Sequence, residues 1–133
     1  MFFKAKKFNQ APSLGSRGED AAVKYLQGNG YKILETNFCN TSGLRLGEID
    51  IIAQEGEEIV FIEVKTRRIA SIYSQIPEEN INHRKLYKLS KISSFYLKKH
   101  GLINSPYRFD AISIMANPQE KSAKLRHLKN IFL

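Results

Sequence analysis

Two strand-like stretches near the middle of the chain carry isolated charges among aliphatic residues. Residues 49–53 contain Asp50, and residues 59–67 contain Glu63 and, two positions later, Lys65. An ionised side chain inside an apolar strand is costly to bury unless it is paired or binds a metal ion. The types and positions of these charged residues therefore suggest a catalytic or metal-binding role.

A short charged turn at residues 54–57 joins the two stretches, which predicts an antiparallel hairpin. In that hairpin Asp50 lies opposite Phe61 or Glu63 and shares a face with Glu63. The Cβ atoms of directly facing residues are about 4.5–5.5 Å apart. Two ionised carboxylates at about 5 Å repel by roughly 3 kcal/mol at an effective dielectric constant of 20, and a divalent cation between them turns that cost into a binding site. Hard oxygen ligands favour Mg²⁺ or Mn²⁺ over zinc.

Lys65 is predicted to lie on the same face as Glu63, because side chains alternate with period two along a strand. Its ammonium group can then reach a metal-bound water or a phosphate. A carboxylate–metal pair with one lysine is sufficient for phosphodiester hydrolysis. The alternative is structural: Glu63 and Lys65 form ion pairs on a half-exposed strand, and Asp50 ends a strand. Glu48 is expected to flank the site as a turn or salt-bridge residue.

Glu19 is a further candidate for the same site. On the helix predicted at residues 15–29 it falls on the apolar stripe with Ala22 and Leu26, which directs it toward the sheet. The competing interpretation is local, because Ser16 and Glu19 have the spacing of a capping box. Spacing alone leaves both interpretations open.

The remaining elements complete an α-β-β-β-α-β-β order. We expect a strand at 31–38 near a sheet edge, a second helix at about 82–100, a strand at 107–115, a turn at 117–118 and a last strand at about 125–132. This order predicts a single α/β domain at residues 14–133, with a mixed central β-sheet flanked by helices. Residues 1–13 are expected to form a flexible basic arm.

The charge balance favours a polyanionic partner. The 133 residues include 21 Lys and Arg against 13 Asp and Glu, a net charge of +8. A basic domain of this kind suits nucleic acid more than a membrane surface, although ordinary solubility charge is the alternative. The second helix carries cations and no carboxylate among its exposed positions, which favours phosphate binding. The alternative is that these cations only form an ordinary solvent-exposed face. These cations are Arg84, Lys85, Lys88, Lys91, Lys98 and Lys99.

Several other residues carry less information. The single Cys39 excludes an internal disulfide and a paired-cysteine metal site, so a reducing cytoplasm is the expected location. No apolar run approaches the length of a membrane span. Asp110 is expected to pair with a neighbouring cation. His83, His100 and His127 are scattered and suggest neither a zinc site nor a catalytic dyad.

Several motifs along the chain resemble those of the YraN family of small bacterial proteins. The strongest are Gly15-Ser16-Arg17-Gly18-Glu19-Asp20-Ala21-Ala22, Gly47-Glu48-Ile49-Asp50-Ile51-Ile52-Ala53 and Val60-Phe61-Ile62-Glu63-Val64-Lys65-Thr66-Arg67, with Asn37 between the first two and weaker matches at Lys85, 108–110 and 127–132. The family in turn resembles the PD-(D/E)XK, restriction-endonuclease-like nucleases, and is close in pattern to Holliday-junction resolvases. That resemblance implies that Asp50 is the first acidic ligand, Glu63 and Lys65 the E-x-K pair, and Glu19 the helix-borne carboxylate. The segment from 68 to 82 departs from the pattern, with Glu78 and Glu79 in place of a glycine-containing stretch.

The sequence therefore supports a divalent-metal-dependent endonuclease acting on structured or branched nucleic acid, DNA more than RNA. Asp50, Glu63 and Glu19 are the expected metal ligands for Mg²⁺ or Mn²⁺, and Lys65 assists the nucleophile. The expected phosphate contacts are Arg45, Arg67, Arg68, Arg84, Lys85 and Lys88. A homodimer is suggested only by the resemblance. The alternatives are a nucleic-acid-binding module with an idle metal site, and a structural protein that docks an acidic surface.

Overall fold

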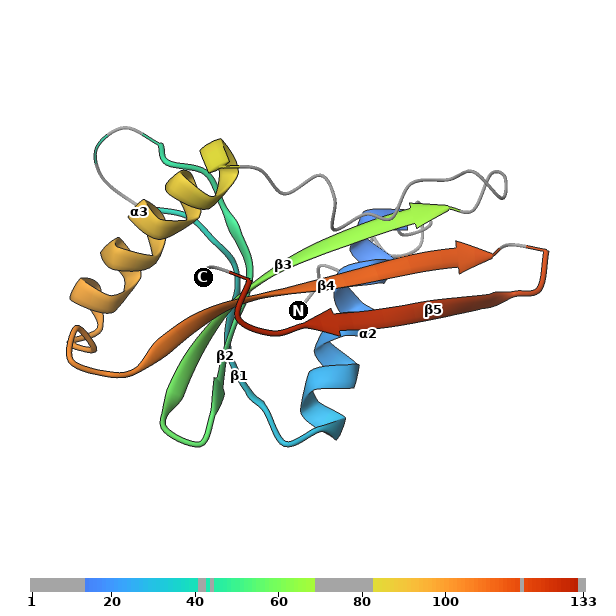
Figure 1. The fold of residues 1–133 in the computed structure, drawn as a ribbon, viewed down its shortest axis with the longest axis horizontal. Coiled ribbons are helices and arrows are strands. Elements are labelled where there is room, and N and C mark those ends of the chain that lie inside the picture. The colour runs from blue at the N-terminus through green and yellow to red at the C-terminus, as the bar shows by residue number, and fades with distance from the viewer. Residues whose placement is uncertain (1–13, 41–42, 44, 69–82, 118, 132–133) are drawn as a thin grey trace, which may run out of the picture.

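A five-stranded β-sheet forms the centre of the molecule, and one helix covers each of its faces (Figure 1). The computed structural model describes residues 14–40, 43, 45–68, 83–117 and 119–131. The elements are α2 (Leu14–Gly28), β1 (Lys32–Phe38), β2 (Ile49–Glu55), β3 (Glu58–Arg68), α3 (His83–Lys99), β4 (Tyr107–Asn117) and β5 (Ser122–Leu128). This is the predicted α-β-β-β-α-β-β order, and the fold is the expected α/β fold with a mixed sheet.

The sheet order is β1-β2-β3-β4-β5. Neighbouring strands are antiparallel except for β3 and β4, which run parallel. A parallel neighbour requires a crossover connection, and the chain between β3 and β4 contains α3. The predicted hairpin is confirmed as β2–β3, which turns between Glu55 and Glu58. The prediction that the first strand lies at a sheet edge is also confirmed, because β1 is the outermost strand on its side.

The alternation of side chains along β3 divides the core into two layers. Ile59 and Phe61 pack on the side of α3, whereas Val60 and Ile62 pack on the side of α2. Both sets are almost fully buried. A strand that is apolar on both faces is stable only in the middle of a covered sheet, which is where β3 lies.

The last strand differs from its predicted bounds. It begins at Ser122 and ends at Leu128, because its pairing with β4 starts at the Asn117–Ser122 pair, directly after the turn. Its exposed polar first half gave no apolar pattern to detect. After Leu128 the chain leaves the ladder, and the Ile131 amide donates to the Phe109 carbonyl at 2.8 Å.

Three predicted features lie outside the described residues: the basic arm at 1–13, the part of the segment from 68 to 82 that follows Arg68, and Pro118 of the predicted turn. None of the helices in the described ranges is long and apolar enough to cross a membrane.

Helix α2 approaches β3 most closely at Gly18. A Cβ atom added there would lie 1.9 Å from the Thr66 Oγ1 atom and 3.0 Å from its Cβ atom. Glycine is therefore required for the contact between this helix and the end of the strand. The contact also fixes the positions of the residues on either side of Gly18.

We predict that Gly18→Ala destabilises the fold by about 1–3 kcal/mol, because the added methyl group overpacks the contact with Thr66. Urea unfolding followed by circular dichroism measures the change.

Gly15→Ala is the matched control in the same helix: nothing in the described part of the chain lies within 4 Å of its added Cβ atom, so it is expected to raise stability by up to about 1 kcal/mol. Adding Thr66→Ala to Gly18→Ala should recover part of the loss. Equal stability of Gly18→Ala and wild type would show that the contact is not tight.

Candidate functional site

Asp50 lies where the ladder between β2 and β3 stops. The last pair is Ile51–Ile62, and beyond it the Asp50 Oδ2 atom accepts a hydrogen bond from the Val64 amide at 2.8 Å. Ile49 and Ile51 pack in the cores on opposite faces of the sheet, so the regular alternation of side chains is interrupted at Asp50. The carboxylate is therefore held by the backbone of β3 and not by strand alternation alone.

Glu63 is buried beside two lysine ammonium groups. The Lys65 Nζ atom lies 3.8 Å from the Glu63 Oε2 atom, and the Lys85 Nζ atom of α3 forms a closer ion pair with the same oxygen. Glu63 retains only 7% of its surface, whereas both lysine side chains are about one-third exposed. The prediction that Lys65 shares a face with Glu63 is confirmed. Lys85, expected to contact nucleic acid, lies in the site itself.

The carboxylate of Asp50 is poorly compensated. Burial raises its pKa most, the negative charge of Glu63 raises it further, and Glu19 and Glu48 add smaller contributions in the same direction. The hydrogen bond from Val64 opposes these effects, and the resulting pKa is about 7. The predicted approach of Asp50 to Glu63 is therefore present, with two further carboxylates near enough to act on it.

The two lysines influence each other. The hydrogen-bond contact with Lys85 and then burial lower the pKa of Lys65, although Glu63 and Asp50 oppose the change. Burial is the largest influence on Lys85 and would lower its pKa, but the hydrogen-bond contacts with Glu63 and Lys65 and the charges of Glu63 and Asp50 together outweigh burial and raise it. The charge of Lys85 is thus the more firmly held of the two, and Lys65 is the lysine that more readily releases a proton.

Glu19 lies in the first half of α2 and reaches the end of β1, where its Oε1 atom accepts a hydrogen bond from the Asn37 Nδ2 atom at 3.1 Å. The capping-box alternative is wrong, because α2 begins at Leu14 and Ser16 lies inside the helix. Asn37 has a φ of 53°, a left-handed conformation that asparagine tolerates better than most residues. Spacing alone gave no indication of this contact, although Asn37 is one of the residues that match the family pattern.

The donor set of this site suits a hard divalent cation. Asp50 and Glu63 offer carboxylate oxygens on adjacent strands, and burial and the charge of Glu63 both raise the pKa of Asp50. Within the described ranges, no three Asp, Glu, His or Cys side chains are grouped so that they could hold a metal ion together. Asp50 and Glu63 are therefore the two side chains that would hold Mg²⁺ or Mn²⁺, and Glu19 as a third ligand stays a prediction.

Most of the predicted phosphate contacts are exposed. Arg67 and Arg68 lie at the end of β3, and Arg45, Arg84 and Lys88 are also accessible to solvent. Sequence reasoning missed Tyr87, which lies on α3 among these cations and is 62% exposed. The Lys91 Nζ atom lies 5.3 Å from the centre of the Tyr87 ring. The run of cations around a tyrosine was the sequence feature that could have identified it.

A second polar cluster is buried on the α2 side of the sheet, between β4 and β5. Asp110 accepts hydrogen bonds from the Arg108 Nε atom at 3.0 Å and from the Asn130 amide at 2.9 Å. The His127 Nε2 atom lies 2.7 Å from the Asp110 Oδ2 atom, and the Tyr25 hydroxyl lies 3.0 Å from the His127 Nδ1 atom. The prediction that Asp110 pairs with a cation is confirmed, whereas the place of His127 beside it was not anticipated.

This cluster differs from the first in being well compensated. Burial alone would raise the pKa of Asp110, but its hydrogen bonds with His127, Arg108 and the Asn130 amide outweigh burial and lower it. Arg108 also pairs with Glu58 at 2.7 Å. The cluster therefore joins β4 and β5 to the β2–β3 turn, and its role is structural.

These observations define a small α/β protein whose central hairpin presents two carboxylates and a lysine to a second lysine from a helix. The chain belongs to the family described as "Uncharacterised protein family UPF0102", whose sequence model matches residues 18–114. This confirms the resemblance to the YraN family. The relatives described below are all called UPF0102 proteins.

Three relatives show how far the similarity extends. A protein from Persephonella marina is 43% identical over 118 residues, which cover 89% of this chain and 91% of the relative. One from Clostridium botulinum is 44% identical over 121 residues, covering 90% and 93%. One from Caldanaerobacter subterraneus is 40% identical over 129 residues, covering 96% and 99%.

We predict that Asp50→Asn stabilises the metal-free fold at high pH. The folded state holds a proton on Asp50 between about pH 4 and 7 that the unfolded state releases, so stability falls as the pH rises through this window. Asparagine keeps an oxygen for the Val64 amide and removes the charge. The variant should exceed wild type by about 1–3 kcal/mol at pH 9, and the gain should disappear toward pH 4.

Urea unfolding in EDTA at several pH values measures this difference. Glu57→Gln, at the exposed turn of the same hairpin, is the matched control and should change stability little at any pH. A gain for Asp50→Asn that does not depend on pH would contradict the prediction.

Asp110→Asn should have the opposite effect. The lowered pKa of Asp110 contributes stability above the unfolded value of about 3.9 that is lost as the pH falls through the folded value. At pH 7 the variant is expected to lose about 3 kcal/mol, because Arg108 is left partly uncompensated in a buried site. The loss should shrink toward pH 3. Asp20→Asn, on the exposed face of α2, is the control in the same unfolding experiment.

Proposed function

We propose that this protein is a divalent-metal-dependent endonuclease that hydrolyses phosphodiester bonds of nucleic acid, DNA in preference to RNA. The observation that carries the proposal is the convergence of Asp50, Glu63, Lys65 and Lys85 at the end of the β2–β3 ladder. The resemblance of this hairpin to the PD-(D/E)XK pattern supports the same reaction. The preference for structured or branched DNA comes from that resemblance alone.

Each side chain has a distinct task in this proposal. Asp50 and Glu63 would hold Mg²⁺ or Mn²⁺, which when bound makes hydroxide available at neutral pH and offsets the charge on the phosphate. The Val64 amide holds the Asp50 carboxylate in place through its hydrogen bond. Lys65, one-third exposed and next to Glu63, orients the attacking water or stabilises the developing negative charge.

Lys85 compensates the buried charge of Glu63. A buried ionised carboxylate is costly without a cation beside it, and the ion pair with Lys85 offsets that cost. The same ammonium group also lies near Lys65 and lowers its pKa. Lys85 is thus a positioning residue that pairs with Glu63 and lowers the pKa of Lys65.

The outer face of α3 offers a surface for the phosphates of the substrate. Arg84 and Lys88 are exposed there, and the accessible Tyr87 ring lies among them. Cations beside an exposed aromatic ring are typical of surfaces that bind single-stranded nucleic acid. Because these residues lie within one turn of Lys85, a strand bound along this face passes close to the carboxylates.

A second candidate function is nucleic-acid binding without cleavage. It is favoured by the ion pair between Lys85 and Glu63, which supplies a cation to the site from the protein itself. In the described ranges no third ligand joins Asp50 and Glu63 in a metal-binding group. In that case the acidic cluster would be inherited and catalytically idle.

Divalent binding and cleavage separate the two functions. Wild type should bind Mn²⁺ in an electron paramagnetic resonance titration, and Asp50→Asn or Glu63→Gln should weaken that binding by about 10-fold or more, as expected for the loss of one of two ligands. In a panel of single-stranded, duplex and branched DNA and RNA, Lys65→Ala should abolish cleavage. Its binding in EDTA should remain close to that of wild type, because one phosphate contact among several is a small part of the affinity.

Two exposed residues provide matched controls. Glu57→Gln removes a carboxylate from the turn of the same hairpin, and Lys98→Ala removes a cation from the last turn of α3. Both should retain cleavage. If wild type binds nucleic acid yet cuts no substrate with Mg²⁺ or Mn²⁺, the binding module is the correct function.

A further inference from the structure

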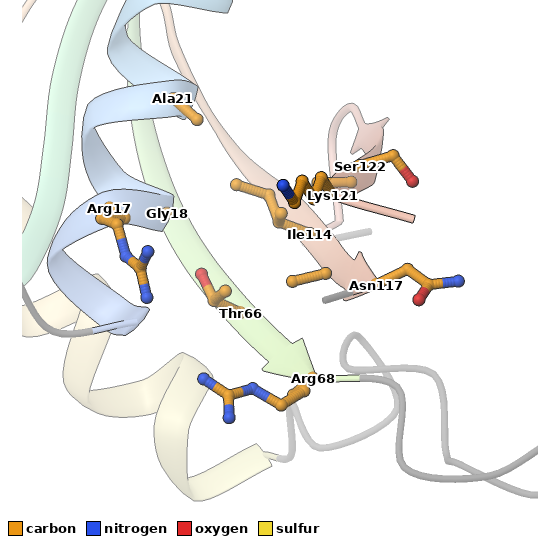
Figure 2. Close-up of a pocket in the computed structure, with 11 residues that line it drawn as sticks. Arg17, Gly18, Ala21, Thr66, Arg68, Ile114, Asn117, Lys121 and Ser122 are labelled. Carbon is orange, nitrogen blue, oxygen red and sulfur yellow. The ribbon is translucent and has the colours of Figure 1, made fainter. Parts of the chain in front are cut away.

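A cavity of about 530 Å³ lies on the α2 side of the sheet (Figure 2), and neither Asp50 nor Glu63 lines it. The first turns of α2 form one wall. The ends of β3 and β4 and the beginning of β5 form the rest. Cavities of this volume are typical of small-ligand sites, which have an apolar lining and a few polar groups.

The lining of the cavity has two chemical parts. Its apolar surface comes from Ala21, Ile114 and two further alanines, Ala116 and Ala123. Among the described residues its charged groups are all positive, and no carboxylate lines it. They are Arg17, Arg68 and Lys121. In Figure 2 Arg17 and Arg68 extend on either side of Thr66, with Lys121 across the cavity from them.

These cations are not neutralised by the parts of the chain that the structure describes. Arg17, Arg68 and Lys121 form no ion pair with any carboxylate among those residues. Three cations around an apolar concavity repel one another, and an anionic ligand offsets that repulsion. The lining therefore suits a ligand with a phosphate and an apolar ring.

The cavity and the acidic site share two elements. On β3, Thr66 faces the cavity, whereas its neighbour Lys65 reaches Glu63 on the other face of the sheet. On α2, Gly18 lines the cavity, whereas its neighbour Glu19 acts on Asp50. A nucleic-acid strand held at the carboxylates therefore has the cavity within reach around the end of β3.

We propose that this cavity binds one unpaired nucleotide of the strand that contacts the acidic site. Its base lies on the apolar surface, and its phosphate contacts Arg17, Arg68 and Lys121. The inference rests on the proposed function in taking nucleic acid as the ligand. It narrows the substrate to nucleic acid with an unpaired nucleotide next to the site, because a concavity of this size holds one base and excludes a duplex.

The test uses the intact protein and a fluorescein-labelled single-stranded DNA oligonucleotide, with binding measured by fluorescence anisotropy in EDTA so that no cleavage occurs. Ala21→Leu fills the cavity without changing any charge, and it lies at an exposed helical position that accepts leucine. We expect it to weaken binding by about 5-fold or more, the loss of one base contact. Gln27→Leu, exposed on the same helix outside the cavity, should leave binding nearly unchanged.

A second pair of variants tests the charged groups. Arg17→Ala should weaken binding by about 5-fold or more and reduce the slope of log K against log salt concentration by about 0.7. Lys24→Ala removes an exposed cation from the same helix outside the cavity and should do neither. Ala123→Leu fills the cavity from β5 and repeats the test of occupancy with an independent residue. Circular dichroism and thermal unfolding confirm that each variant is folded.

The outcomes separate this inference from the proposed function. If Ala21→Leu and Ala123→Leu bind the oligonucleotide as tightly as wild type, the cavity is not occupied and the inference is overturned, even where Mg²⁺-dependent cleavage is present. The inference is also overturned if Ala21→Leu weakens binding of a blunt, fully paired duplex as much as that of the single strand. If only single-strand binding weakens, the inference stands whether or not the protein cleaves DNA.

Discussion

The close contact between Gly18 of α2 and Thr66 of β3 fixes how the helix lies against the end of the strand, where the candidate site and the cavity are found. Only a residue without a side chain allows the helix to approach the strand at this point. Successive residues of a helix point in different directions, so Arg17 and Glu19, on either side of Gly18, serve different surfaces. Arg17 lines the basic cavity, and Glu19 adds its charge to the surroundings of Asp50. One packing contact therefore places both sites relative to the end of β3.

Two aspartates of the sheet, Asp110 and Asp50, have opposite electrostatic surroundings. Asp110 is surrounded by hydrogen-bond donors, and they hold its pKa below the usual value despite nearly complete burial. Burial and then the charge of Glu63 raise the pKa of Asp50 to about 7, although the Val64 amide donates a hydrogen bond to it. A buried group that the protein compensates by itself contributes to stability, whereas a strongly perturbed buried group marks a candidate functional site. This contrast distinguishes a structural carboxylate from a candidate functional one.

The hairpin and α3 together bring the charged groups of the candidate site into contact. Glu63 is buried between β3 and the helix, and two ammonium groups share one of its oxygens. Such a cluster tolerates two cations close together because Glu63 and Asp50 supply opposing charge. Helix α3 directs Lys85 toward the buried Glu63, whereas Tyr87 on the same helix is exposed to solvent. The helix therefore connects the buried ion pair to the surface that is expected to bind a polyanion.

The sequence by itself determined the order of elements, the β2–β3 hairpin and the shared face of Glu63 and Lys65, because these follow from local periodicity and from a short turn. It also identified Asp50 and Glu63 as unusual, since a charged residue within an apolar strand can be recognised from the amino-acid sequence alone. Only the tertiary structure decided which distant groups meet them: Lys85 reaches Glu63 from α3, and His127 reaches Asp110 across a strand pair. The start of β5 and the cavity beside Thr66 likewise depended on pairing and packing. Such contacts join residues far apart in the chain, and no spacing rule within one element encodes which of them come together.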